Sequence, residues 1–515
     1  MTGNRQGSNR SSGAPLLLYG GAIFISSAVT LVLEITAGRL IAPYVGVSIY
    51  SWTSIIGVVL AGLSLGNWLG GEWADRGGAD RGAGLVLVGA AMASLGVLAV
   101  LTIVAPIIMT SELSLLSGAF ALAASLFFVP SVLLGVITPL LTTLALRRSE
   151  QLGRIVGSMH ALAALGSIAG TFASGFWLIQ YLGTRNILIL CTVTLLLLSI
   201  PFLIRRSPGA LVGGIALVLL TGGISHARHG FLNPCTKESQ YYCIRVEPAS
   251  DEVPFGEARA LVLDHLLHGI SHSTEPGMLV SPFVHLTDEL VLGYLGPEAV
   301  NARYFFAGGG AYTLPRAVKA LTPEASVTVA EIDPAVTETA AEALYLDRTG
   351  MRILHTDARM ALHRLAGEQF DVVVGDVVHD VAMPWHLLTR EYSALVKSRL
   401  ASDGLYVLTV IDGYPDPLLV KSIVKTLREQ FRYVHVWLGD LPLVPVRETF
   451  ILTATDRFDP PRTITALRGF ERQWTRVTHQ LESNGTALDM LPVLTDDFVP
   501  VERLVGRLMF TELGR

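Results

Sequence analysis

The sequence predicts a multi-pass α-helical membrane domain, followed by an α/β domain with a doubly wound sheet and a small β-unit at its start. Long apolar stretches with few charges occupy the chain up to about Ile224, and their lengths are those that a bilayer requires. Beyond that point charged residues become frequent, and short apolar strands alternate with helical segments, which is typical of a mostly parallel sheet. We therefore expect four segments: a polar tail over 1–14, the membrane domain over 15–224, the β-unit over 225–282 and the α/β domain over 283–515.

Composition excludes several classes of protein. The 515 residues are 51% hydrophobic and 16% charged, with a mean hydropathy of +0.50. A net charge of −5 and the lack of a basic stripe argue against nucleic-acid binding, and we expect no metal site. Three cysteines exclude a disulfide-rich scaffold. Cys191 lies in an apolar run, whereas Cys235 and Cys243 flank a short polar segment and could pair only in an oxidising compartment.

The first half of the chain contains six or seven membrane spans. The N-terminus is polar and the first apolar run leads into more of them, so we expect no cleavable signal peptide. The last run, 210–224, is marginal in length. The six longer runs are Leu16–Leu33, Trp52–Leu69, Leu85–Met109, Leu116–Leu140, Val156–Ile179 and Ile187–Ile204.

The arginine distribution predicts the orientation of these spans in the cell (inner) membrane. Arginines cluster in alternate loops, at 5 and 10, 76 and 81, 147 to 154, and 205 and 206. By the positive-inside rule the N-terminus and the end of the sixth span are cytoplasmic. If the seventh run crosses, the α/β domain is outside; if it folds back, the domain is cytoplasmic. We expect the α/β domain on the cytoplasmic side for two reasons. The seventh run is short, and a domain of this class that binds a nucleotide-like cofactor would find that cofactor only in the cytoplasm.

Two features of the membrane half carry functional interest. Glu34 and Arg39 flank the end of the first span, and an ionisable residue at membrane depth is a functional hypothesis by default. The alternative is that they pair and reach the interface. The turn GNWLGGEWADRGG resembles the loop between the second and third helices of major facilitator transporters, with Asp75 and Arg76 able to pair. The helices are too few for a complete transporter of that type.

The stretch Arg303 to Ala335 organises the second half. An apolar run ends in Gly308, Gly309 and Gly310, a helical pattern follows, and a second apolar run ends at Glu331. Glycines allow a backbone to approach a ligand closely, and an acid at the end of the next strand can accept ribose hydroxyls. The alternative is a tight turn in a structural α/β domain.

Two more acids end apolar strands. MRILHTDARMAL gives a strand that ends near Asp357, and FDVVVGDVV gives one that ends at Asp376. Ligands bind at the carboxyl ends of the strands in doubly wound sheets. The glycines, Glu331, Asp357 and Asp376 all lie at such ends, so we expect them to meet in one site. The segments YYCIRVEP and ARALVLDHLLHGI read as the small antiparallel unit before this sheet.

Six motifs stand out along the chain: LEITAGRLIAPYVG, GGGAYTLPR, VAEIDP, HTDAR, PWHLLTREY and LTDDFVPVE. On these motifs the chain from Leu33 to Leu504 resembles bacterial proteins that fuse a major facilitator-like membrane region to a spermidine synthase-like domain. The resemblance implies the Rossmann-like class I methyltransferase fold preceded by a β-domain. It also implies a cofactor of the AdoMet type, a small amine as acceptor and a lipid bilayer as environment, and it leaves a homo-oligomer open.

The resemblance also implies roles for residues. Glu331 would hold the ribose, Asp357 with its neighbour Ala358 the adenine, and the three glycines the sulfonium-bearing chain. Asp376 would be the general base that takes a proton from the attacking amine, which is nucleophilic only when neutral. Acids and a histidine around it would bind the cationic substrate; the candidates are Asp264, His268, Asp380, Asp496 and Asp497, for each of which a structural or solvated role is the alternative. His379 and His386 are further candidates to line the cleft, with a structural role as the favoured interpretation of each.

Departures from the family pattern keep three functions open. Soluble spermidine synthases have an acid directly after the glycines, which grips the aminopropyl amine of decarboxylated AdoMet, and this chain has Ala311. The Tyr-His-Glu stretch of the family is replaced at 279–281, and a glutamine is replaced by His268. We therefore weigh an aminopropyl transferase, a methyltransferase or other enzyme that consumes intact AdoMet, and a transporter or sensor with a non-catalytic nucleoside-binding domain.

Overall fold

The computed structural model describes residues 13–77, 80–111, 113–148, 151–378, 383–439, 441–457 and 460–506. The described chain forms two compact units, one ending at Pro234 and one beginning at Cys235. We describe each unit by itself.

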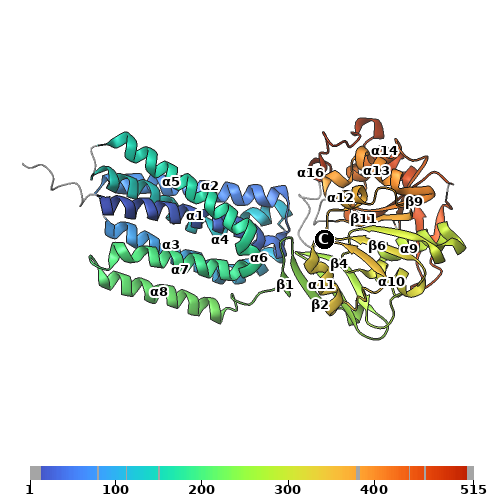
Figure 1. Cartoon of the computed structure of the whole chain (residues 1–515), viewed down its shortest axis with the longest axis horizontal. Coiled ribbons are helices and arrows are strands. Elements are labelled where there is room, and N and C mark those ends of the chain that lie inside the picture. Colours follow the sequence, from blue (N-terminus) through green and yellow to red (C-terminus); the bar gives the residue numbers. More distant parts are fainter. Residues whose placement is uncertain are drawn as a thin grey trace, which may run out of the picture. The chain divides into compact units, whose positions relative to one another are not determined.

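The first unit is a bundle of long apolar helices (Figure 1). Among the described residues seven helical spans are long and apolar enough to cross a membrane, so the predicted multi-pass domain is confirmed and the marginal seventh run is a helix of 20 residues. A π-helical segment, Ser174–Leu178, joins α5 to α6, so the two form one span. The helices are α1 Gly13–Val45, α2 Ile49–Asp75, α3 Asp80–Met109, α4 Leu115–Leu146, α5 Leu152–Ala173, α6 Ile179–Leu182, α7 Thr184–Leu203 and α8 Pro208–Ala227.

Glycines allow two pairs of helices in this bundle to pack in close contact. A Cβ at Gly66 in α2 would lie 2.1 Å from the carbonyl oxygen of Val132 in α4. A Cβ at Gly166 in α5 would lie 2.1 Å from the carbonyl oxygen of Phe24 in α1. Small residues allow helix backbones to approach this closely inside membranes. The bundle therefore contains a tight α2–α4 pair and a tight α1–α5 pair.

Polar contacts show which loops share an end of the bundle. Asp80, at the start of α3, forms ion pairs with Arg148, which follows α4, and with Arg206, which follows α7. It also accepts a hydrogen bond from Tyr19, near the start of α1. At the other end of α7, Arg185 donates hydrogen bonds to the Gly230 carbonyl (3.1 Å) and the Asn233 side chain (3.2 Å), both beyond α8. The chain therefore leaves the bundle at the end opposite to Asp80.

The second unit begins with an antiparallel sheet of four strands among the described residues, as the sequence predicts. A disulfide joins Cys235 to Cys243, so the segment that enters this sheet is closed into a short loop. Asp264 adopts a positive φ of 54° in the turn between the last two strands, and its carboxylate accepts a hydrogen bond from the Cys243 amide. The strands are β1 Lys237–Glu238, β2 Cys243–Pro248, β3 Ala258–Leu263 and β4 Leu266–His272.

The main sheet has the order β12-β13-β10-β11-β9-β8-β5-β6-β7 within the described chain. The strands from β9 to β7 are parallel, whereas β11, β10, β13 and β12 are antiparallel. The order reverses between β5 and β8, which creates the switch point at which ligands bind in doubly wound sheets. The strands are β5 Arg303–Ala307, β6 Ser326–Ala330, β7 Met351–Leu354, β8 Phe370–Gly375, β9 Leu400–Tyr414, β10 Tyr433–Leu438, β11 Val446–Thr455, β12 Thr463–Thr465 and β13 Gln473–Arg476.

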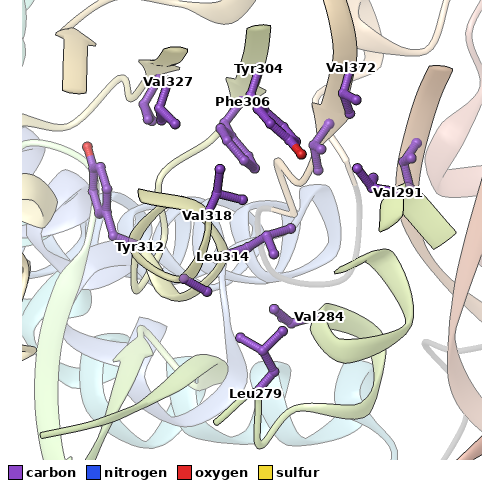
Figure 2. Packing of buried hydrophobic residues seen from close by; sticks show 14 of the residues in the cluster. Leu279, Val284, Val291, Tyr304, Phe306, Tyr312, Leu314, Val318, Val327 and Val372 are labelled. Atoms are coloured by element: carbon purple, nitrogen blue, oxygen red, sulfur yellow. The ribbon is translucent and has the colours of Figure 1, made fainter. Parts of the chain in front are cut away.

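Helices cover this sheet and close a hydrophobic core around its central strands. Figure 2 shows Tyr304 and Phe306 of β5 and Val372 of β8 above Leu314 and Val318. Burying such side chains contributes roughly 1.5–3 kcal/mol each, so the core fixes the strand ends that carry the site. The helices of the unit are α9 Pro282–Leu295, α10 Thr313–Leu321, α11 Pro334–Ala343, α12 Ala358–Arg364, α13 Arg390–Arg399, α14 Leu418–Leu427, α15 Thr478–Ser483 and α16 Val501–Leu504.

Candidate active site

A cavity of about 270 Å³ lies at the carboxyl ends of β5, β6 and β8. This volume is close to that of sites for small ligands, which hold about 300–1,000 Å³. The structure brings most of the predicted cofactor residues to this one place. They are Gly308, Gly310, Glu331, Asp357 and Ala358, and the predicted base Asp376 joins them, whereas Gly309 lines a neighbouring hollow.

The glycine turn is held by Glu331. The buried carboxylate accepts hydrogen bonds from the amides of Gly309 (2.8 Å) and Gly310 (3.4 Å), and its other oxygen accepts one from Asp333 (2.9 Å). Burial raises the pKa of Glu331, and these amide hydrogen bonds act against that rise. A carboxylate has about four lone-pair positions, so Glu331 can hold the turn and still accept a bond from a ligand hydroxyl.

Gly308 and Gly310 both have a positive φ, but they differ in the space available for a side chain. Gly308 has a φ of +94°, and a Cβ there would lie 2.1 Å from the carbonyl oxygen of Asp376. Gly310 has a φ of +50°, and the nearest atom to its Cβ would be the His268 carbonyl oxygen at 3.9 Å. A side chain at Gly308 would therefore collide with the backbone that follows β8, whereas one at Gly310 would project into open space beside the cavity.

Asp357 caps α12 and contacts His386. One oxygen accepts from the Met360 amide (3.0 Å), and the other lies 2.7 Å from the His386 ring nitrogen Nε2. Burial acts to raise the pKa of Asp357, but the hydrogen bonds from His386 and Met360 outweigh it and hold the pKa below its ordinary value. Asp357 is therefore ionised at neutral pH and orients His386 in the cavity wall.

Asp376 follows β8 and faces the cavity. Asp376 keeps some solvent-accessible surface, but protein atoms surround its carboxyl group closely. The resulting desolvation raises the pKa of Asp376 from 3.8 to about 6. A hydrogen bond with Thr409 of β9 acts in the opposite direction. A carboxylate with a raised pKa can both accept a proton and release it near neutral pH.

A second, smaller hollow of about 30 Å³ adjoins the first. Asp376, Gly308 and His268 line both, so the two hollows meet at Asp376. Thr409 and Ala311 line only the smaller one. Asp376 is the one acid among the described residues that line this hollow, and Ala311 leaves it without the acid that the family pattern carries there.

His268 lies between the β-unit and the loop after β8. Its ring nitrogens lie 2.9 Å from the Leu266 carbonyl oxygen and 3.1 Å from that of Val378. These contacts position the ring at the junction of the two hollows.

The remaining predicted substrate residues do not join this group. Asp264 is buried in its turn and bound to the Cys243 amide, and Asp496 is paired with Arg359 at 2.6 Å. Neither these acids nor Asp497 line either hollow in the described structure. Asp380, like His379, lies outside the described residues.

Sequence reasoning missed several residues of the site. Thr409 sits inside a buried apolar strand, and Tyr241 and Tyr242 precede β2. Burial raises the pKa of Tyr241, and the nearby carboxylates of Asp333 and Asp357 raise it further. No sequence signal pointed to these residues, because their role depends on which strands become neighbours. The described residues contain no group of three His, Cys, Asp or Glu placed to hold a metal ion.

Comparison with known proteins gives partial matches. The sequence matches no protein-family model. It is 33% identical over 129 residues to a polyamine aminopropyltransferase of Vibrio vulnificus (strain CMCP6), covering 24% of this chain and 42% of that protein. It is 24% identical over 216 residues to a probable polyamine aminopropyl transferase of Bifidobacterium longum (strain NCC 2705), covering 41% of this chain and 45% of that protein. The chain thus spans less than half the length of these curated relatives.

Solved structures give weaker likenesses. A probable spermidine synthase from Corynebacterium glutamicum ATCC 13032 has a TM-score of 0.43 at 20% identity, covering 49% of this chain and 96% of that one. A spermidine synthase in complex with the transition state analogue AdoDATO has a TM-score of 0.32 at 20% identity, covering 42% of this chain and 70% of that one. The described chain therefore joins a unit of seven apolar helices to a unit that is similar in sequence to polyamine aminopropyltransferases.

Proposed function

We propose that the chain is a membrane-anchored transferase that alkylates an amine with an AdoMet-type cofactor, by aminopropyl transfer. The observation that carries this proposal is the position of Asp376, at the junction of a cavity sized for a small ligand and a second hollow. The cavity residues fit such a cofactor, since Glu331, Asp357 and Asp376 offset its positive charge and Gly310 leaves open space beside it. The curated relatives carry the same activity in their names.

In this proposal each residue performs one step that its environment permits. Glu331 holds the glycine turn and accepts ribose hydroxyls, and Asp357 with Ala358 binds the adenine side. Asp376 orients the neutral amine and accepts its proton as the new C–N bond forms. When bound, the cofactor supplies an electrophilic carbon beside its sulfonium, whose C–S bond breaks with the electron pair left on sulfur as a neutral thioether.

A second candidate is a methyltransferase that uses intact AdoMet. Ala311 favours it, because the acid that would select against the carboxylate of intact AdoMet is missing from the smaller hollow. The full-length protein should be incubated with decarboxylated AdoMet or AdoMet and a polyamine panel. Release of 5′-methylthioadenosine from the decarboxylated form supports aminopropyl transfer. Release of S-adenosylhomocysteine from intact AdoMet would show methyl transfer and overturn the aminopropyl proposal. Turnover of neither cofactor would refute both enzymatic functions.

We also propose that the second unit lies on the extracytoplasmic side of the membrane. The loops that meet at Asp80 carry the clustered arginines, so this end is cytoplasmic by the positive-inside rule. The chain leaves the bundle at the other end, where Arg185 contacts Gly230 and Asn233. The Cys235–Cys243 disulfide follows directly, and such bonds persist in oxidising compartments.

This orientation is the reverse of the one that cofactor supply suggested from the sequence. Its main support is α8, which at 20 residues is about 30 Å long and matches the hydrocarbon thickness. Fusions to alkaline phosphatase and to green fluorescent protein after Arg206 and after Arg228 test it. We expect fluorescence only at Arg206 and phosphatase activity only at Arg228. Fluorescence at Arg228 would return the unit to the cytoplasm.

A further inference from the structure

The membrane unit contains a cavity of about 490 Å³ with several polar side chains in its wall, and the proposed transfer does not use it. It is lined by α1, α2, α4 and α5, the helices that form the two pairs packed closely at glycines. More than half of the lining residues carry a hydroxyl, amide or imidazole group, among them Thr30, Asn67, Thr142 and His160. Polar groups inside a membrane are costly and mark substrate or ion pathways.

The lining is rich in hydrogen-bond acceptors. Pro139 has no N–H to donate to the carbonyl of Gly135, four residues before it, and both residues line the cavity. Thr30 donates its hydroxyl hydrogen to the Ser26 carbonyl at 2.9 Å, so its oxygen presents lone pairs. The described lining residues include no lysine or arginine, which would repel a cation.

An acid extends this surface along α1. Ser27, Thr30 and Leu31 line the cavity, and Glu34 lies on the same face one turn further on, because residues three and four apart on a helix are neighbours. Glu34 is partly buried. A carboxylate beside a set of neutral oxygen acceptors matches a cationic ligand, whose water shell the oxygens replace.

We propose that this cavity is a binding site for a small organic cation that carries primary amines. It lies in the half of the bundle nearer the Asp80 end, since Thr142 is one turn from the end of α4 and His160 is about two turns from the start of α5. Lining residues come from both helix pairs, so a bound ligand would bridge the interface between the pairs. The site is separate from Asp376 and goes beyond the proposed transfer.

The test measures radiolabelled putrescine binding to the full-length protein in lipid nanodiscs. All variants are made in the Asp376→Asn chain. This substitution lowers the amount of putrescine bound at the Asp376 site and prevents turnover from consuming the label. Thr138→Val/Thr142→Val removes two hydroxyls at constant volume and should raise Kd at least tenfold, since each bond to a charged group contributes about 1.5–3 kcal/mol. Glu34→Gln should raise it likewise. Thr221→Val, on α8 away from the cavity and hydrogen-bonded to the Leu217 carbonyl, is the matched control and should leave Kd unchanged.

Competition separates a cation site from a general polar one. 1,4-Butanediol has the length of putrescine without its charges and should not displace it. Equal displacement by the diol would overturn the cationic class. Binding that is unchanged in the Thr138→Val/Thr142→Val chain, or absent in the Asp376→Asn background, would remove the site. None of these outcomes bears on turnover by the wild-type chain, which tests the proposed transfer independently.

Discussion

Asp376→Asn separates chemistry from binding at the proposed site. Asparagine keeps the size of the side chain and can still hydrogen-bond to Thr409, but it cannot accept a proton. Loss of a positioned general base costs about a hundred- to ten thousandfold, so we expect kcat to fall by that order. Cofactor affinity should barely change, because Glu331 and Asp357 are intact.

The pKa of Asp376 also predicts how kcat/KM depends on pH. Since the pKa of Asp376 is raised to about 6 by burial, about nine-tenths of the wild-type chains hold the ionised base at pH 7. Only the ionised form accepts a proton, so kcat/KM should fall as pH drops through about 6, by about tenfold for each further pH unit. The variant should lack this acidic limb.

The assay is initial-rate release of 5′-methylthioadenosine between pH 5 and 8, with calorimetric cofactor binding and thermal unfolding of the same chain. A raised pKa means that the folded protein destabilises the ionised carboxyl, so stability is lost as pH rises from 3.8 to about 6. Asp376→Asn should therefore be at least as stable as the wild type at pH 8. Full activity in the variant would refute Asp376 as the base. Joint loss of cofactor binding and turnover would instead make it a cofactor or structural residue.

Three further predictions test residues around the base and the fold. Thr409→Val removes the bond that lowers the pKa of Asp376, so the acidic limb of kcat/KM should move above pH 6, and an unmoved limb would contradict that contact. Glu331→Gln weakens the grip on the glycine turn and on the ribose, so calorimetry should show at least a tenfold loss of cofactor affinity; unchanged affinity would remove Glu331 from the site. Lys421→Met removes the buried ammonium that bonds Asp416 at 2.6 Å, while Thr486 still donates to that carboxylate, so the free energy of unfolding should fall by about 1.5–3 kcal/mol; a value within 1 kcal/mol of the wild type by denaturant titration would show that the pair is dispensable.

The sequence predicted well where a local pattern has one physical solution. Spans of the membrane unit follow from the apolar length that a bilayer demands, and all were found as helices, although the marginal run at 210–224 became a full helix, α8. The strand ends at Gly308, Glu331 and Asp376 follow from apolar runs that stop at a glycine or an acid. The sheet is less parallel than predicted, because strands of the same pattern, β10 and β11, pair in the antiparallel sense.

Isolated acids were the least predictable part. Asp264 and Asp496 fit the idea of a shell around an amine, yet one stabilises a turn through the Cys243 amide and the other pairs with Arg359. A carboxylate in a loop binds whichever donor the fold places beside it. The sequence shows the acid and does not show that donor.

By itself the sequence determined the membrane half, the alternation of strands and helices, and the acids at the strand ends, because these depend on spacing along one chain. Tertiary structure alone decided what each acid contacts. It brought Thr409 to Asp376, His386 to Asp357, and the loops beyond α4 and α7 to Asp80. It also paired the helices so that a cavity with polar side chains in its wall lies between them. These contacts join residues far apart in the chain, and only the packing of strands and helices against one another sets which of them meet.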